Sequence, residues 1–260
     1  MEKWILRIAT AGVRTGLAMT GQEDAMKRGL NRNQLKYLVI LAMVVDHVAW
    51  AFVPLLSRTG QAMHFFGRLT GPAMAFFIAE GYLHTRDVKK YAGRLALFAL
   101  LSWPAFSYFE TGKWFTPHFG VIYTLLLGLL AVWIWDQAPV HPLLRLVPIA
   151  ALVWLSRWGD WEWWDVLWPL VPVMFRDKPK VKWWAFAALC AAAAGYLIWL
   201  YPHYRWPWWA GIHNLGLLAV PPLLRFGYNG QSGSRHPFHK WFFYGFYPAH
   251  LLILGLLRWM

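Results

Sequence analysis

The chain has a single cysteine and few charged residues. Asp and Glu number 12 against 25 Lys and Arg in 260 residues, and charged residues make up 14% of the chain. A soluble domain carries about 25% charged residues, so the surface of a water-soluble fold of this size would be short of charge. The lone Cys190 excludes an intramolecular disulfide and is best interpreted as a small apolar packing residue.

Several motifs that would define a chemistry are also missing. The net charge of +13 comes without a glycine-rich phosphate loop, a zinc finger or an aromatic RNA-binding strand, so no nucleic-acid partner is expected. Neither HExxH nor another compact ligand cluster occurs, so no metal site is expected. A GxSxG context for a catalytic serine is absent. Arg7, Arg14, Lys27 and Arg28 interrupt the apolar residues of the N-terminus, which argues against a cleaved signal peptide.

Apolar sequence, by contrast, is abundant. The chain is 58% hydrophobic and has 20 Trp, many of them at the ends of apolar runs, as in an interfacial belt. The runs predict an all-α, polytopic transmembrane helical bundle of about nine spans. Dense Trp and acidic residues over 154–168 leave open whether the fifth and sixth form full spans or an interfacial hairpin. The expected ranges are 35–56, 61–84, 91–110, 118–136, 141–157, 163–176, 182–201, 209–227 and 239–258.

Connections rich in Lys and Arg alternate with connections poor in them. Basic residues gather before the first span, over 86–94 and over 176–182, whereas the intervening connections hold little more than Arg58 or Lys113. The positive-inside rule then predicts a cytoplasmic N-terminus and, with nine spans, an outward C-terminus. We expect residues 1–34 to form an amphipathic cytoplasmic segment, followed by one transmembrane domain over 35–260.

Two ionisable residues stand side by side within the first apolar run. A central Asp costs about 2.5–3.5 kcal/mol on insertion scales, so such residues face a protein interior or a water-filled cavity and are functional candidates. Asp46 and His47 lie about 100° apart on a helix, so Asp46 is not expected to orient His47. Arg68 on another span is its more plausible partner. His250 lies near the middle of the last span with Tyr247 on the same face, and could line one cavity with His47.

The second span and the connection after it carry further polar residues. Glu80 and His84 are four residues apart and could pair. Beyond them lies a basic stripe with helical spacing, suited to phosphate groups or, alternatively, to topology and anionic lipid. His64, His118 and His141 lie near proposed interfaces and are expected to be solvated. The stripe consists of Arg86, Lys90 and Arg94, with Lys89 beside it.

Two strings carry a resemblance to a known family: Ala79-Glu80-Gly81-Tyr82-Leu83-His84-Thr85-Arg86 and Phe246-Tyr247-Pro248-Ala249-His250. Together with Val45-Asp46-His47, they resemble TraX, the F-pilin acetylation protein family. The similarity covers residues 33–128 and 238–257, whereas 139–235 resembles the family only in hydropathy.

The resemblance implies a multi-pass enzyme of the bacterial inner membrane that uses acetyl-CoA to acetylate the N-terminus of conjugative pilin. Its expected partners are therefore acetyl-CoA, a pilin subunit and membrane lipid. The chain is more distantly similar to membrane acyltransferases that carry acyl groups from cytoplasmic CoA to an acceptor on the far side. A histidine within a membrane helix is the catalytic group proposed for them.

On this basis we expect His47 to act as the base. Asp46 and Arg68 are expected to balance the charge of the cavity, and Tyr247 and His250 to complete it or to stabilise the oxyanion. Glu80 is a further candidate of the catalytic site. The residues expected to bind acetyl-CoA are His84, Arg86, Lys89, Lys90 and Arg94.

Other functions remain open at this point. An ion-coupled secondary transporter could use Asp46 and Glu80 as carriers, but predicts inverted repeats that are not visible. A non-catalytic pilus assembly factor is another possibility. Binding of acetyl-CoA separates the enzyme from both. The acceptor, and the choice between direct transfer and an acyl-histidine intermediate, are left open too.

Overall fold

The computed structural model describes residues 29–260, and all the regular elements in that range are helical. Helix α2 (Arg32–Phe52) begins at Asn31, whose side chain accepts a hydrogen bond from the Gln34 N–H at 3.0 Å. The Gln34 side chain accepts from the Asn31 N–H in return, also at 3.0 Å. This capping box fixes the start of the helix that carries Asp46 and His47.

The second expected span is divided in two. Helix α3 (Arg58–Gly67) ends at Arg68, and α4 (Thr70–His84) begins two residues later. Pro72 lies in the first turn of α4, where the missing N–H costs nothing but where a helix continuing from α3 would lose a hydrogen bond. A continuous helix over 61–84 was therefore a wrong expectation, and Arg68 lies at the break between the two helices.

The next three helices are more regular. Helix α5 (Val88–Thr111) is capped by Asp87, which accepts from the Lys90 N–H at 2.9 Å, and it ends at Gly112 with φ of +72°. Helices α6 (Val121–Gln137) and α7 (Pro142–Leu155) follow. The left-handed φ at Gly112 lets the chain leave α5 without Cβ strain.

Two later expected spans are irregular. The sixth is built from two short helices on either side of Trp168 and Pro169, and the eighth is a succession of 3₁₀, α and π turns. Pro221 and Pro222 interrupt the hydrogen bonding of the eighth. These elements and their neighbours are η1 (Ser156–Trp158), α8 (Trp164–Leu167), α9 (Leu170–Met174), α10 (Pro179–His203), η2 (Trp208–Ala219), α11 (Val220–Pro222), η3 (Leu223–Gly227) and α12 (Pro237–Trp259).

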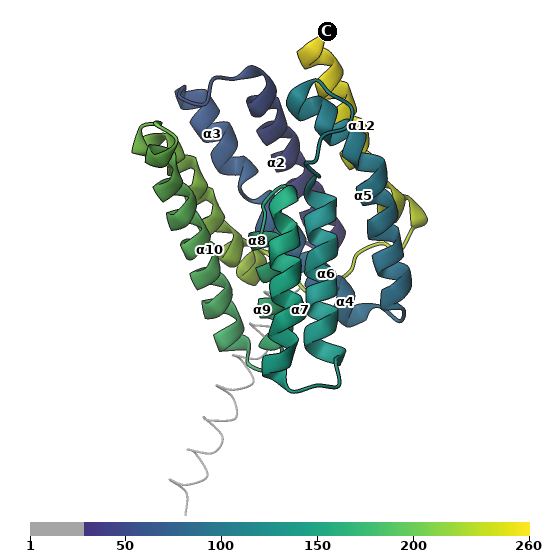
Figure 1. Cartoon of the computed structure of the whole chain (residues 1–260). Coiled ribbons are helices and arrows are strands. Elements are labelled where there is room, and N and C mark those ends of the chain that lie inside the picture. Colours follow the sequence, from purple (N-terminus) through teal and green to yellow (C-terminus); the bar gives the residue numbers. More distant parts are fainter. Residues whose placement is uncertain (1–28) are drawn as a thin grey trace, which may run out of the picture.

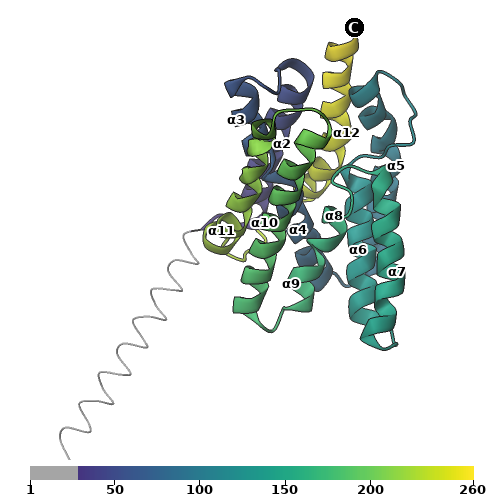
Figure 2. The same cartoon turned by 60° about the vertical axis from the view of Figure 1, so that its left-hand side comes forward.

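The long helices run roughly side by side, as Figures 1 and 2 show. Helices α2, α3 and α12 lie mainly toward one end of the bundle and α4, α6, α7 and α9 toward the other, and α5 extends between the two ends. Helix α6 packs against α4, α5, α7, α8 and α9, whereas α12 packs against α2 and α5. Fully buried Phe106, Phe109, Leu129 and Trp168 are among the side chains that join these helices.

Two helices, α2 and α10, are long and apolar enough to cross a membrane. Large apolar side chains are exposed along several others, including Leu100 on α5, Val147 on α7 and Leu257 on α12. The nine-span arrangement, the cytoplasmic N-terminus and the single domain over 35–260 stay predictions. Most of the expected amphipathic segment 1–34 lies outside the described residues.

Candidate active site

A cavity of about 350 Å³ lies among α2, α3, η2 and the loop before α8. We call it the imidazole cavity, because three histidine rings line it: His47, His64 and His213. Polar groups at such density inside an apolar bundle make this cavity a candidate functional site. The other polar side chains on its wall are Asp46, Arg68, Thr70, Asp160, Tyr201 and Tyr247.

His47 on α2 is hydrogen-bonded to His250 on α12, with 2.8 Å between His47 Nδ1 and His250 Nε2. His250 Nδ1 lies 3.0 Å from the carbonyl oxygen of Phe246, so it carries a proton. Burying an unpaired charge is costly, which favours a neutral His250 whose Nε2 accepts from His47 Nδ1–H. The lone pair of His47 is therefore on Nε2, the ring nitrogen that takes no part in the bond to His250.

His64 on α3 is held in a similar way by a carboxylate. Its Nδ1–H donates to Asp46 Oδ1 at 2.8 Å, and both side chains are largely buried. Gly67 permits this approach, because a Cβ there would collide with the Asp46 side chain. His64 is 7% exposed, so the expectation of a solvated histidine was wrong. Asp46 does not orient His47; it orients His64.

His213 on η2 has both ring nitrogens engaged. Its Nδ1–H donates to the carbonyl oxygen of Ala210 at 2.9 Å, and its Nε2 accepts from the Tyr201 hydroxyl at 3.3 Å. Its ring lies beside His64, with 5.4 Å between centroids. Since no lone pair is free, His213 supports the wall of the cavity and takes no proton from a ligand.

Arg68 is placed differently from the expectation. It was expected to pair with Asp46 or Glu80, but no ion pair joins it to either residue in the described part of the chain. Its guanidinium lies over the Trp161 ring, 4.9 Å from the centroid, and its buried Nε has no hydrogen-bond partner there. Arg68 is thus a cation on the cavity wall with capacity to bind an anionic group.

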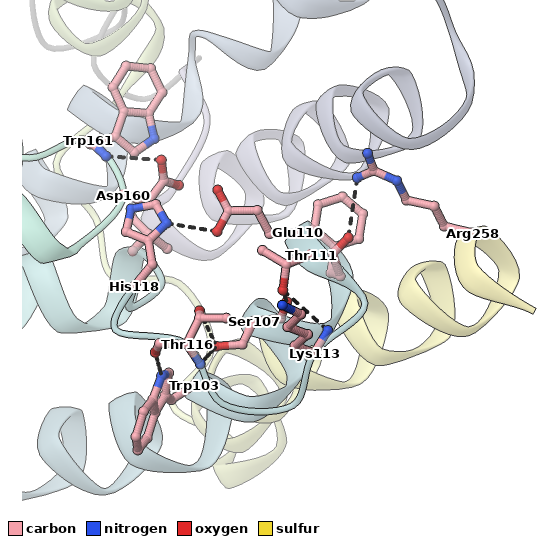
Figure 3. A network of polar contacts seen from close by, with 12 residues as sticks. Trp103, Ser107, Glu110, Thr111, Lys113, Thr116, His118, Asp160, Trp161 and Arg258 are labelled. Atoms are coloured by element: carbon pink, nitrogen blue, oxygen red, sulfur yellow. Dashed lines mark hydrogen bonds and ion pairs between the residues drawn. The ribbon is translucent and has the colours of Figure 1, made fainter.

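Asp160 adds a second carboxylate to the imidazole cavity, from the loop before α8. Its Oδ1 accepts from the Trp161 N–H at 3.0 Å, and behind it His118 is paired with Glu110 at 2.7 Å (Figure 3). Burial raises the pKa of Asp160 to about 6, although the positive charges of Arg68 and His118 act to lower it. The hydrogen bond that His118 donates to the Glu110 carboxylate raises the pKa of His118. Asp160 thus takes up a proton at a higher pH than an ordinary aspartate does.

A second cavity of about 350 Å³, the central cavity, adjoins the first. The two share four wall residues, namely Met43, Thr70, Val121 and Tyr247. The Tyr247 hydroxyl accepts from the Val121 N–H at 3.2 Å, which leaves its own proton available at the shared wall. The central cavity is mainly apolar inside, with Arg32, Lys36, Arg235 and Lys240 among its lining residues.

A third cavity of about 820 Å³, the basic cavity, continues the row. It shares Arg32 and Arg235 with the central cavity. Five Arg or Lys side chains line it against two acidic ones, so its potential is positive. These are Arg32, Arg86, Lys90, Arg94 and Arg235, with Glu80 and Asp87.

Most of the residues expected to bind acetyl-CoA lie together at the basic cavity: His84, Arg86, Lys90 and Arg94 line it. Lys89 is exposed and does not line it. Glu80 lines the basic cavity, far along α4 from the imidazole cavity, and accepts a hydrogen bond from the Tyr228 hydroxyl. His84 does not pair with its side chain; His84 Nδ1 bonds the Glu80 backbone carbonyl at 2.8 Å. Glu80 thus belongs with the basic cavity.

Helix α2 passes all three cavities in order. Arg32 lines the basic and central cavities, Met43 the central and imidazole cavities, and His47 the imidazole cavity alone. At 1.5 Å per residue, about 22 Å of helix separates Arg32 from His47. The three cavities therefore follow one another along one face of this helix, with the basic cavity at one end and the imidazole cavity at the other.

Sequence reasoning missed His213 and Asp160 and misplaced His64. His213 lies in an apolar stretch and Asp160 in an acidic loop, so a search for ionisable groups near apolar runs would have found them. No pattern in the chain pairs them with α2, because the contacts span more than a hundred residues. In residues 29–260 no group of three or more His, Cys, Asp or Glu is placed to hold a metal ion.

Fold and site together define an all-helical protein whose apolar bundle encloses a histidine-lined polar cavity. The model of the TraX protein family matches residues 31–258, and the chain belongs to this family. The resemblance drawn from the motifs is thereby confirmed.

One relative of the chain has a descriptive name. The chain is 32% identical over 235 residues to the probable fimbrial assembly protein FimC, serogroup H1, of Dichelobacter nodosus. The alignment covers 85% of this chain and 93% of that protein. No solved structure matches the chain significantly.

Proposed function

We propose that this chain is an integral acetyltransferase of the bacterial inner membrane. It transfers an acetyl group from acetyl-CoA to the N-terminal amine of a pilin subunit. Membership of the TraX family and similarity to a fimbrial assembly protein support a role in pilus biogenesis. The observation that carries the enzymatic part is the row of three cavities ending at the oriented His47.

The chemistry of the cavities matches the parts of acetyl-CoA in order. Phosphate groups suit the arginines and lysine of the basic cavity, which offer charge-assisted hydrogen bonds. The pantetheine arm is long and largely uncharged, and it suits the mainly apolar surface of the central cavity. The thioester then lies at the shared wall, where Tyr247 can donate to the developing oxyanion.

Transfer itself needs a base beside the acceptor. The amine nitrogen bonds to the thioester carbonyl carbon, and the carbon–sulfur bond breaks as the thiolate leaves. His47 Nε2 accepts the proton that the attacking nitrogen loses, and the thiolate takes up a proton to become the free thiol. An imidazole suits this step because its ordinary pKa of about 6.5 lies near working pH.

Charge and hydropathy favour a donor that enters from the cytoplasm. The basic cavity lies at the connections that the positive-inside rule assigns to the cytoplasmic side. The imidazole cavity includes Val53 and Leu55 at the opposite end of α2, toward the far side. Exposed apolar side chains on α5, α7, α10 and α12 suit a lipid environment.

The direct test is acetylation by the full chain, purified in detergent, with acetyl-CoA and a peptide carrying the pilin N-terminus. Mass spectrometry of the peptide should show acetylation by the wild type. His47→Ala should lower it by at least about 10²-fold, the typical contribution of a general base. His203→Ala is the matched control, because exposed His203 only bonds the Trp199 carbonyl of its own helix. Equal rates for the wild type and His47→Ala would rule out His47 as the base.

The name of the relative supports a second candidate, a non-catalytic pilus assembly factor. That function predicts binding of pilin without affinity for acetyl-CoA. Calorimetric titration of the purified chain with acetyl-CoA separates the two, since the enzyme must bind it. Binding that vanishes in Arg94→Glu would place the donor at the basic cavity.

A further inference from the structure

Acetylation of an amine requires the removal of two protons from the acceptor. An N-terminal amine has a pKa of about 7.7–8.0, so at neutral pH most of it is the ammonium form. One proton must leave before the nitrogen can attack, and a second leaves as the amide forms. The departing thiolate takes back one proton, so the net reaction releases one.

The imidazole cavity holds two histidines whose geometry suits these two tasks. His47 is held through Nδ1 by His250, and His64 is held through Nδ1 by Asp46. In both rings this leaves the Nε2 lone pair without a partner among the described residues 29–260. The third ring, His213, has no free lone pair, because Ala210 and Tyr201 engage both of its nitrogens.

The carboxylate partner distinguishes the two bases. When His64 accepts a proton it becomes an imidazolium, and the adjacent Asp46 carboxylate stabilises that charge. His47 has the uncharged His250 in the same position, so it holds a proton less firmly. His64 is thus suited to remove a proton from a cation and keep it, and His47 to accept a proton briefly and pass it on.

We propose that His64, oriented by Asp46, is a second catalytic base that converts the ammonium form of the acceptor into the free amine. The proposal rests on the acetyltransferase function above and assigns the acceptor as a protonated primary amine. In the first step the N–H bond of the ammonium breaks and the proton passes to His64 Nε2. In the second the neutral nitrogen forms its bond to the acetyl carbon while His47 takes the second proton. Asp46 acts as a positioning residue through His64.

The charges around His64 come from several elements. Helix α2 contributes Asp46 and His47, η2 contributes His213, and the end of α3 contributes Arg68. Tyr201 of α10 and Asp160 of the loop before α8 line the same cavity. Asp46 bonds His64 directly and Asp160 adds a second carboxylate, so an ammonium group finds compensating negative charge there despite Arg68.

The test compares two nucleophiles on the full chain in detergent with acetyl-CoA. One is a peptide with a free N-terminal amine, and the other is hydroxylamine, which is largely uncharged at neutral pH. His64→Gln should lower the peptide rate by about 10²-fold and leave the hydroxylamine rate within a few-fold of wild type. Raising the pH should restore peptide acetylation in this variant, because the amine then loses its first proton to water. Asp46→Asn should show the same pattern more weakly.

His47→Ala is the contrasting variant and should lower the rates with both nucleophiles. A His64→Gln variant that loses both rates equally at every pH would overturn the proposal, since a structural role has that signature. An unchanged peptide rate would overturn it as well.

A measurement without turnover separates this proposal from the function it rests on. Nitrogen-15 NMR of histidine-labelled protein, with His64→Gln to assign the signal, should show neutral His64 protonated at Nδ1 and bare at Nε2. The opposite tautomer would exclude His64 as a base even if the chain is an acetyltransferase. A wild type that acetylates neither nucleophile, with acetyl-CoA unbound, would instead overturn the proposed function and the second base together.

Discussion

The imidazole cavity and the basic cavity are built from different kinds of polar contact. In the imidazole cavity His47, His64 and His213 each have a specific hydrogen-bond partner, at distances of 2.8 to 2.9 Å for their Nδ1 atoms. In the basic cavity Lys90 is exposed, and the buried Nε of Arg94 has no hydrogen-bond partner among residues 29–260. The first cavity determines where protons lie, whereas the second supplies positive charge. We therefore expect changes in the first to affect turnover and changes in the second to affect affinity.

The largest expected effect comes from releasing His47 from its partner. His250→Ala removes the acceptor for His47 Nδ1–H, so the ring can rotate or adopt the other tautomer. We expect kcat to fall by about 10²-fold with little change in KM for acetyl-CoA. Steady-state kinetics with a pilin peptide measures both constants. A rise in KM at constant kcat would mean that the two cavities are not separate in function.

The next effect concerns the basic cavity. The double variant Lys90→Glu, Arg94→Glu should raise KM for acetyl-CoA by at least about tenfold, since each charge-assisted contact contributes about 1.5–3 kcal/mol and about 1.4 kcal/mol is a factor of ten. Added salt should weaken wild-type binding in the same direction.

Lys89→Glu is the matched control for this pair. Lys89 is a neighbouring exposed lysine that does not line the basic cavity. Equal losses of affinity in the control and in the double variant would assign the whole stripe to nonspecific electrostatics or lipid contact.

A moderate effect is expected from the glycine that lets α3 approach Asp46. In Gly67→Ala the new methyl group collides with the Asp46 side chain, so either α3 shifts or the His64–Asp46 hydrogen bond breaks. We expect a loss of about 1–3 kcal/mol of stability, as for overpacking elsewhere. Thermal unfolding in detergent measures it. Gly93→Ala is a control on α5, where a Cβ meets open space.

The smallest effect should follow from Asp160. Burial raises the pKa of Asp160 to about 6. Between about pH 4 and 6 the carboxyl is therefore protonated in the native state and ionised in the unfolded state. Stability therefore rises as the pH falls through 6, and the buried charge costs stability above it. Asp160→Asn removes the buried charge and should raise the unfolding temperature at pH 8, by about 2–4 °C for each 1 kcal/mol of destabilisation that the charge causes. At pH 4 the same substitution should raise the unfolding temperature less. An equal change at both pH values would contradict the raised pKa.

Part of the site could be predicted because it breaks a strong pattern. Asp46, His47 and His250 stand out as ionisable groups within apolar helices, and the basic stripe stands out by its spacing. The partners were harder to predict. Asp46 bonds His64, whereas Arg68 at the end of α3 lies over the Trp161 ring, a contact made by a loop more than ninety residues away. Local patterns predicted one continuous helix over 61–84, and they gave no sign that it would break between Gly67 and Thr70.

Hydropathy and charge spacing alone determined the helical class of this protein, the approximate position of most helices and the identity of the residues most expensive to bury. These follow from local physics, since an apolar run must be helical to satisfy its backbone in an apolar setting. Only the tertiary structure decided which imidazole faces which partner and how three cavities line up along α2. Such contacts join residues up to about two hundred positions apart, and their geometry depends on how the helices pack.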